Sequence, residues 1–168
     1  MLILGIDPGN EQSAYALIDE EYRPIRFGKL PNEVMRKTIS DIELRNYGNR
    51  SEGAIKSAIE MISHYGTGMA AGRTVYDTCI WIGRFTEILG SDPALIPRKT
   101  VVTNICGNPK AKDSNVIQAL IDRFAYGVPN HGKGTKKAPG WFYGFTADVW
   151  QAYALAVTYL DILKEGEK

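Results

Sequence analysis

Three acidic residues stand at apolar segments where a charge is costly to bury. Asp7 ends the run 2–7, Glu60 is flanked by alanine, isoleucine and methionine, and Asp148 opens the apolar segment 146–163. Each has an ordinary alternative: a turn residue, the exposed side of a strand, or an acid at a helix N-terminus. A buried carboxylate needs a hydrogen bond, an ion pair or a metal. Together the three predict a site for a hard cation, Mg²⁺ or Mn²⁺.

Basic residues are concentrated in the segment 97–140. The segment holds two acidic residues and eight basic ones: Arg98, Lys99, Lys110, Lys112, Arg123, Lys133, Lys136 and Lys137. The whole chain carries a net charge of only +1, so this segment stands out. A solvated surface is one explanation, and a polyanionic partner is the other. Combined with the acids, the charge pattern suggests a metal site that faces a phosphate backbone.

Several other kinds of site are excluded. Two histidines and two cysteines that lie 27 positions apart cannot form a clustered zinc site or a disulfide framework. The sequence has no phosphate-binding Gly-x-x-x-x-Gly-Lys loop and no Gly-x-Ser-x-Gly nucleophile motif. No run approaches the roughly 18 apolar residues of a membrane span, and the N-terminus does not resemble a signal peptide. We therefore expect a cytoplasmic protein without a membrane partner or a nucleotide cofactor.

The elements that must position the acids follow from periodicity. With 168 residues, the chain is expected to form a single domain over 1–168. Apolar or alternating runs predict strands at 2–7, 13–19, 24–30, 55–62 and 94–97. The first three are close together in the chain, as in an antiparallel meander.

Helical spacing of apolar residues predicts the remaining elements. Helices are expected from Asn32, a candidate N-cap, and at 69–89, 99–105, 114–124 and 146–163. The Gly-, Pro- and Lys-rich residues 127–140 are expected to form a loop. Alternation of strands with helices after the meander predicts an α/β fold, a mixed sheet with helices on both faces.

Three motifs resemble the RuvC-type Holliday junction resolvases, in particular those encoded by bacteriophages. They are Gly5-Ile6-Asp7-Pro8-Gly9, Ile59-Glu60 before a long helix, and Ala147-Asp148 followed by Ala154-Leu155-Ala156-Val157-Thr158. They occur in the family's order across nearly the whole chain. The resemblance implies an RNase H-like mixed five-stranded sheet, a homodimer, and a place in a bacterial cell or a phage-infected host.

The resemblance also implies a reaction. Two divalent cations, Mg²⁺ or in its place Mn²⁺, would drive phosphodiester hydrolysis and leave 5′-phosphate and 3′-hydroxyl ends. Asp7 would bridge both metals, and Glu60 and Asp148 would each hold one. Gln151 stands where the family usually has a second Asp; its amide oxygen can ligate without charge, and Glu11 or Asp113 could supply the missing acid. The dimer would nick opposite strands of a branched, four-way DNA junction.

The DNA-binding residues depart from the family in two places. Ser63 occupies the usual position of an aromatic wedge. Tyr65 is then the candidate to stack on an opened base, and the alternative is that its ring packs on its own domain. Lys110 and Lys112 are both candidates for the active-site basic residue. The remaining residues expected to bind DNA are Arg98, Lys99, Lys133, Lys136 and Lys137.

Other interpretations compete with a junction resolvase. Actin-like ATPases and sugar kinases also begin with a Gly-Ile-Asp-x-Gly turn, but they need two such domains. An RNase H-like nuclease for RNA or flaps and a non-catalytic junction-binding protein both stay open. A dimer is expected along the helix 69–89, where Trp81 lies outside the main apolar stripe; alternatively, Trp81 packs under 99–105.

Overall fold

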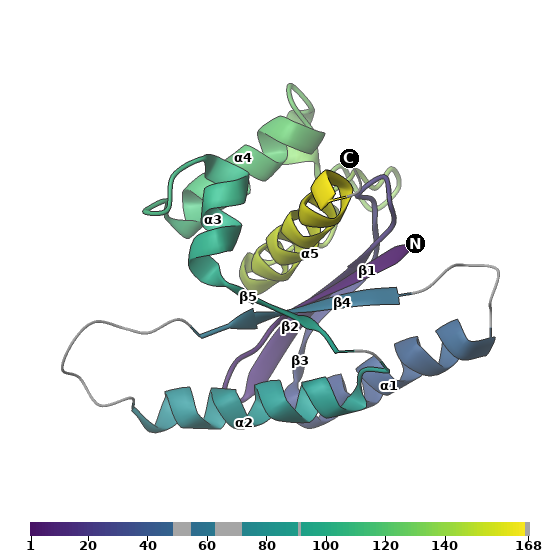
Figure 1. The fold of residues 1–168 in the computed structure, drawn as a ribbon. Coiled ribbons are helices and arrows are strands. Elements are labelled where there is room, and N and C mark those ends of the chain that lie inside the picture. Colours follow the sequence, from purple (N-terminus) through teal and green to yellow (C-terminus); the bar gives the residue numbers. More distant parts are fainter. Residues whose placement is uncertain (49–54, 63–71, 91, 167–168) are drawn as a thin grey trace.

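A five-stranded sheet forms the centre of the chain (Figure 1). The computed structural model describes residues 1–48, 55–62, 72–90 and 92–166. In spatial order, the strands are β3 (Pro24–Pro31), β2 (Gln12–Ile18), β1 (Leu2–Asp7), β4 (Ile55–Met61) and β5 (Ala94–Pro97). The pairs β1–β2 and β2–β3 are antiparallel, whereas β1–β4 and β4–β5 are parallel. The predicted meander and mixed sheet are confirmed.

Helices cover both faces of this sheet, as predicted (Figure 1). The helices α1 (Asn32–Gly48) and α2 (Arg73–Ile88) pack on one face. The other face carries α3 (Arg98–Cys106), α4 (Asp113–Phe124) and α5 (Ala147–Gly166). Helix α5 is buried almost all round because it lies between the sheet and α3 and α4. No helix within the described ranges is long and apolar enough to cross a membrane.

Strand alternation places two of the acids on the α5 face. In β1, Ile3 belongs to the core beneath α5, while Leu4 and Ile6 belong to the core beneath α1 and α2. Successive strand side chains point to opposite faces, so Asp7 shares the face of Ile3. Glu60 follows Ile59 of the opposite core and shares the α5 face in the same way.

The register of β1 and β4 then makes these two acids neighbours. Ile6 pairs with Ile59 in the parallel ladder, and Asp7 and Glu60 are the next residues on the two strands. The two strands run in the same direction, so both carboxylates lie at the same end of the sheet.

Gly5 allows α5 to approach β1 closely enough to share this site. A Cβ at position 5 would lie 2.5 Å from the carbonyl oxygen of Ala152 and 2.8 Å from the amide nitrogen of Ala156. These are backbone atoms, so a larger side chain would push the helix away. The glycine of the Gly5-Ile6-Asp7 motif therefore sets the distance between the strand and the helix that carries Asp148.

The turn after Asp7 is held by side chains that the sequence did not reveal. Ser13 accepts a hydrogen bond from the Gly9 amide (3.1 Å) and donates one to Asn32 Oδ1 (2.7 Å). Asn32 Nδ2 donates to the Gly9 carbonyl (2.9 Å). Ser13 and Asn32 are buried, so each bond is hard to replace. Asn32, the candidate N-cap, is the first residue of α1, and its side chain holds the strand end that presents Asp7.

The segment predicted to be a loop, 127–140, is more ordered than its composition indicated. It contains a short 3₁₀ turn, Pro129–Gly132, and then a hairpin closed by a bridge between Gly134 and Pro139. Thr135 and Ala138 exchange backbone hydrogen bonds across the tip. This hairpin (133–140) carries Lys136 and Lys137 at its exposed end. The glycine and proline residues of this segment therefore form defined turns.

Trp81 has a local partner that the sequence did not suggest. Its ring lies 5.7 Å from that of Phe85, and the Arg84 guanidinium sits 4.6 Å above it. It therefore packs on its own helix rather than under 99–105. The described part of this helix begins at Arg73; Met69 and the other predicted residues before 72 lie outside the described residues.

A polar network fastens α3 and α4 to α5. Asp161 on α5 accepts two hydrogen bonds from Arg123, at 2.7 and 2.8 Å. The same carboxylate accepts one from Asn104 (2.9 Å) and one from the Tyr22 hydroxyl (2.7 Å). Arg123 also stacks over the rings of Tyr22 and Phe124. One carboxylate thus joins both helices and the β2–β3 turn.

Candidate active site

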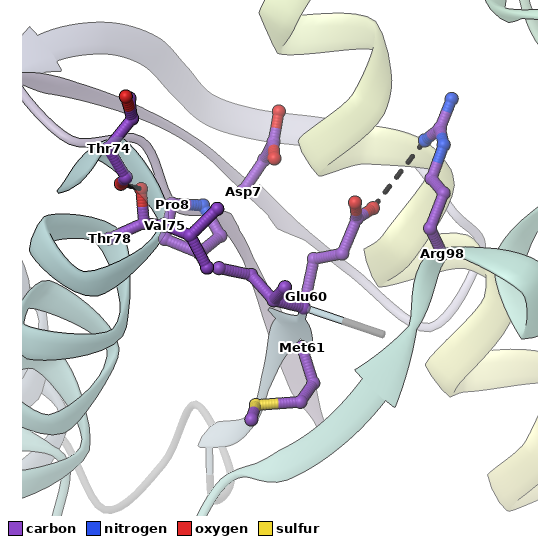
Figure 2. A pocket seen from close by; sticks show the side chains of 9 residues that line it. Asp7, Pro8, Glu60, Met61, Thr74, Val75, Thr78 and Arg98 are labelled. Carbon is purple, nitrogen blue, oxygen red and sulfur yellow. Dashed lines mark hydrogen bonds and ion pairs between the residues drawn. The ribbon is translucent and has the colours of Figure 1, made fainter. Parts of the chain in front are cut away.

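A pocket of about 350 Å³ opens at the end of the sheet where Asp7 and Glu60 emerge. Figure 2 shows both carboxylates reaching into it, with Arg98 beside Glu60. Thr74 and Thr78 of α2 line the opposite wall. Two of the three acids predicted to form one site, Asp7 and Glu60, thus share one cavity.

Arg98 joins the acids to the basic segment. It follows β5 directly and is the first residue of α3. Its Nη1 lies 3.5 Å from Glu60 Oε2, and its Nη2 donates to Asp113 Oδ1 at the start of α4. Arg98 was predicted to contact DNA; the structure places its guanidinium against two carboxylates within the pocket.

Asp148 lies in the first turn of α5 and is paired with a residue that the sequence did not single out. Its carboxylate forms an ion pair with Lys29 of β3. Asp148 does not line the pocket, but it is close enough for its charge to raise the pKa of Asp7. The three predicted acids are therefore gathered at one end of the sheet, with Asp148 turned toward Lys29.

Burial and repulsion combine to make Asp7 an unusual carboxyl group. Desolvation is the main cause that raises its pKa to about 7, and the charges of Glu60, Asp148 and Asp113 raise it further while Arg98 opposes them. Burial also raises the pKa of Glu60, again against Arg98. The charged forms of Asp7 and Glu60 are therefore unfavourable in this site, and a bound cation would stabilise them.

Gln151 supplies an oxygen that lacks a partner. It lies one helical turn after Asp148, and only 8% of its surface is exposed. Its Oε1 is buried and forms no hydrogen bond within the described part of the chain. A buried amide oxygen without a partner costs roughly 1–3 kcal/mol. A cation ligand is one way to recover that cost.

These residues fit a hard divalent cation by the chemistry of their donors. Carboxylate and amide oxygens are the ligands that Mg²⁺ and Mn²⁺ take. Among the described residues, no three acidic, histidine or cysteine side chains are arranged to hold one ion together. Arg98 and Lys29 instead neutralise Glu60 and Asp148. A cation bound here would compete with Arg98 and Lys29 for these carboxylates.

Asp113 is a further acid at this site. Its charge raises the pKa values of both Asp7 and Glu60, and it is bound to Arg98. Glu11, the other candidate for a fourth acid, is exposed. Asp113 was one of the two residues named as candidates for the fourth acid, and the structure places it beside Arg98.

The remaining residues predicted to bind DNA lie mostly on the surface. Lys99, Lys110 and Lys112 are exposed on α3 and on the segment before α4. Lys136 and Lys137 are exposed on the hairpin, and Lys133 at its base is partly buried. Tyr65, with its neighbour Ser63, lies outside the described residues.

The mixed five-stranded sheet with helices on both faces is an α/β fold of the RNase H-like type. No protein-family model matches the chain, and no curated protein matches it. Among solved structures, RuvC of Thermus thermophilus superposes with a TM-score of 0.65 at 18% identity and covers 99% of this chain and 97% of that one. The same protein in complex with a Holliday junction substrate gives 0.63 at 16% identity, covering 99% and 96%. The chain has the RuvC-like fold over its whole length.

Proposed function

We propose that this protein is a structure-selective endonuclease that resolves four-way DNA junctions by paired nicks. The observation that carries the proposal is the adjacency of Asp7 and Glu60 on one face of the sheet, beside Asp148, in a RuvC-like fold. RuvC of T. thermophilus has been solved in complex with a Holliday junction, which supports branched DNA as the substrate class. The motif resemblance suggests that such DNA belongs to a bacterial cell or a phage-infected host.

Asp7, Glu60, Asp148 and Gln151 are the residues that would hold Mg²⁺ or Mn²⁺. Two such ions would activate the attacking water and stabilise the leaving oxygen, giving 5′-phosphate and 3′-hydroxyl ends. The protein's own part is to fix these oxygens on rigid elements: two strand ends and one buried helix. Arg98 is positioned to neutralise charge between the acids and the incoming phosphate.

A cleavage assay tests the proposal directly. We expect the protein, in Mg²⁺, to cut a synthetic four-way junction at symmetric positions and to leave linear duplex intact. Preferential cutting of an RNA–DNA hybrid or a flap would favour the broader RNase H-like nuclease. Tight junction binding without cleavage in Mg²⁺ or Mn²⁺ would favour a non-catalytic junction-binding protein.

Paired nicks require two sites, and we infer a homodimer through α2. Tyr76 and Ile80 on α2 are more than half exposed, and Leu95 of β5 is nearly so. Apolar side chains grouped in this way are typical of an interface. Light scattering at micromolar concentration is expected to give twice the chain mass of 18.6 kDa. A monomeric mass would contradict the dimer, and Ile80→Asp is expected to lower the mass toward the monomer.

Binding is expected to weaken steeply with salt. Lys136 and Lys137 on the hairpin tip and Lys133 at its base can reach phosphates without disturbing the core. Each neutralised phosphate contributes about 0.9 to the slope of log affinity against log salt. Replacing the three lysines by alanine should flatten the slope, measured by fluorescence anisotropy. Lys37→Ala, exposed on α1 across the sheet, serves as the control; an unchanged slope in the triple variant would mean that the hairpin points away from DNA.

Gln151 is expected to limit metal affinity. A carboxylate binds hard cations better than a neutral amide, so Gln151→Asp should tighten Mg²⁺ binding by roughly tenfold. If Asp113 already supplies the fourth acid, the added charge would instead raise a neighbour's pKa and slow cleavage. Calorimetric titration with Mg²⁺ and a metal titration of the cleavage rate separate these outcomes. No change in either measurement would show that Gln151 does not face the site.

A further inference from the structure

Arg98 contacts two carboxylates that belong to different elements. Its Nη1 lies 3.5 Å from Glu60 Oε2 of β4, the contact drawn in Figure 2, and its Nη2 donates a shorter hydrogen bond to Asp113 Oδ1 of α4. The two contacts use different nitrogens of one guanidinium, so both form at the same time. One positive charge faces two carboxylates, and Arg98 therefore cannot neutralise both of them.

The two carboxylates differ in their surroundings. Glu60 lines the pocket together with Asp7, and 18% of its side chain is exposed. Asp113 is not among the residues that line this pocket, and 72% of its side chain is exposed. Water solvates the charge of Asp113, whereas the charge of Glu60 needs a partner within the pocket. That partner is either Arg98 or a bound cation.

The backbones that carry these three residues are fixed by regular structure. Arg98 follows β5 directly, and Ile96 of β5 pairs with Glu60 in the parallel ladder. Asp113 is the first residue of α4, and a side-chain hydrogen bond of 3.0 Å within the first turn holds the start of that helix. The long side chain of Arg98 is therefore the part of this group that can change its position.

The ion pair at Asp148 is arranged differently. Asp148 is paired with Lys29 of β3, and among the ion pairs of the described residues Lys29 contacts no second acid. A cation at Asp148 would release Lys29 to water. A cation at Glu60 would leave Arg98 bound to Asp113, because that contact does not use Glu60. Of these two basic residues, Arg98 thus has a defined second partner.

We propose that Asp113 is a positioning residue: it holds Arg98 on the side of α4 and so leaves Glu60 free to bind a divalent cation. The inference rests on the metal site of the proposed function and deepens it, because it gives Asp113 a role outside the set of metal ligands. Without Asp113, the guanidinium would keep only its contact with Glu60 and compete more strongly with the cation. With Asp113, Arg98 stays at the edge of the pocket, where it can contact a DNA phosphate.

A double-mutant cycle on metal affinity tests this role without DNA and without cleavage. Mg²⁺ is titrated into the free protein by calorimetry, and Mn²⁺ binding is followed by electron paramagnetic resonance. Asp113→Asn should weaken binding by about fivefold, because Arg98 then pairs with Glu60 alone. Asp113→Glu keeps the carboxylate and should bring the affinity back to within about twofold of the wild-type value. In Arg98→Gln protein, Asp113→Asn should change the affinity by less than about twofold.

The comparison of the two backgrounds separates positioning from direct ligation. An equally large loss with and without Arg98 would show that Asp113 binds the cation itself, and would overturn the inference. A loss below about twofold from Asp113→Asn in the wild-type background would also overturn it. Asp122→Asn, at an exposed position of α4, is the matched control and should leave metal affinity unchanged. Urea unfolding without metal checks that each variant is folded.

Failure of this inference is distinguishable from failure of the proposed function. If the wild-type protein binds neither Mg²⁺ nor Mn²⁺, the role of Asp113 is overturned together with the metal site. If the cycle gives the expected result but no junction is cut, the proposed function fails and the role of Asp113 stands.

Discussion

Asp7→Asn is expected to reduce cleavage by about 10³-fold or more while junction affinity changes by less than about twofold. Asp7 lies at the centre of the acidic group, and an amide cannot supply the charge that a hard cation needs. Under the proposed function, affinity would rest on the exposed lysines, which the substitution does not touch. Cleavage and fluorescence anisotropy on the same junction measure the two effects. Substantial residual cleavage would remove Asp7 from the proposed mechanism.

The same variant is expected to be more stable than the wild-type protein at pH 8 without metal. The pKa of Asp7 is raised to about 7 in the folded chain, above the 3.8 of an unperturbed carboxyl. The folded state therefore binds this proton more tightly, and stability from Asp7 is lost as pH rises from about 4 through 7. Asparagine removes this loss, which is on the order of 2–4 kcal/mol.

Urea unfolding at pH 4 and pH 8 tests the stability prediction. The gain should be large at pH 8, small at pH 4, and reduced at pH 8 when Mg²⁺ stabilises the wild-type protein. Asp41→Asn, at an exposed position on α1, is the matched control and should show no such dependence. An equal gain at both pH values would show that Asp7 is not the origin of the effect.

Asp161→Ala is expected to destabilise the fold by about 2–4 kcal/mol without changing the acids of the site. The substitution leaves Arg123, Asn104 and Tyr22 without their shared acceptor. Hydrogen bonds to a charged group contribute about 1.5–3 kcal/mol each, and water can replace part of this loss because Arg123 is partly exposed. Denaturant unfolding at pH 7 measures the loss, and Asp92→Ala, at an exposed position, is the control. A loss below 0.5 kcal/mol would mean that the network contributes little.

The contribution of Asp161 to stability changes with pH in the opposite direction to the contribution of Asp7. Burial raises the pKa of Asp161, but hydrogen bonds from Arg123, Asn104 and Tyr22 outweigh it and hold the pKa below its usual value of 3.8. Stability from Asp161 is therefore present above about pH 4 and is lost as pH falls through the lowered pKa. The difference between Asp161→Ala and the wild-type protein should shrink in strong acid.

The sequence allowed prediction of those site residues whose charge is unusual within an apolar segment. Asp7 and Glu60 could be predicted because a carboxylate within an apolar run needs an explanation, and strand alternation then places both on one face. The five strands and most helix positions followed from periodicity, which is a local property.

The missed residues are ordinary in their local context. Lys29 is one polar residue in an alternating strand, and its pairing with Asp148 depends on how α5 crosses β3. Arg98 and Asp113 were named as candidates, but their contact was missed because it forms only where α3 and α4 meet. Ser13 and Asn32 form their hydrogen bonds across 19 positions. Such contacts follow from tertiary structure, which no local pattern encodes.

The close approach that Gly5 permits between β1 and α5 has a consequence for the order of folding. Asp7 and Asp148 are 141 positions apart in the chain. They come close together only when α5, which is distant in sequence, packs on β1. Contacts of such long sequence separation form slowly because a large loop must close first. A partly folded chain can therefore hold Asp7 and Glu60 together on its strands without Asp148 beside them. The proposed nuclease would therefore have a complete set of acids only after α5 has docked on the sheet.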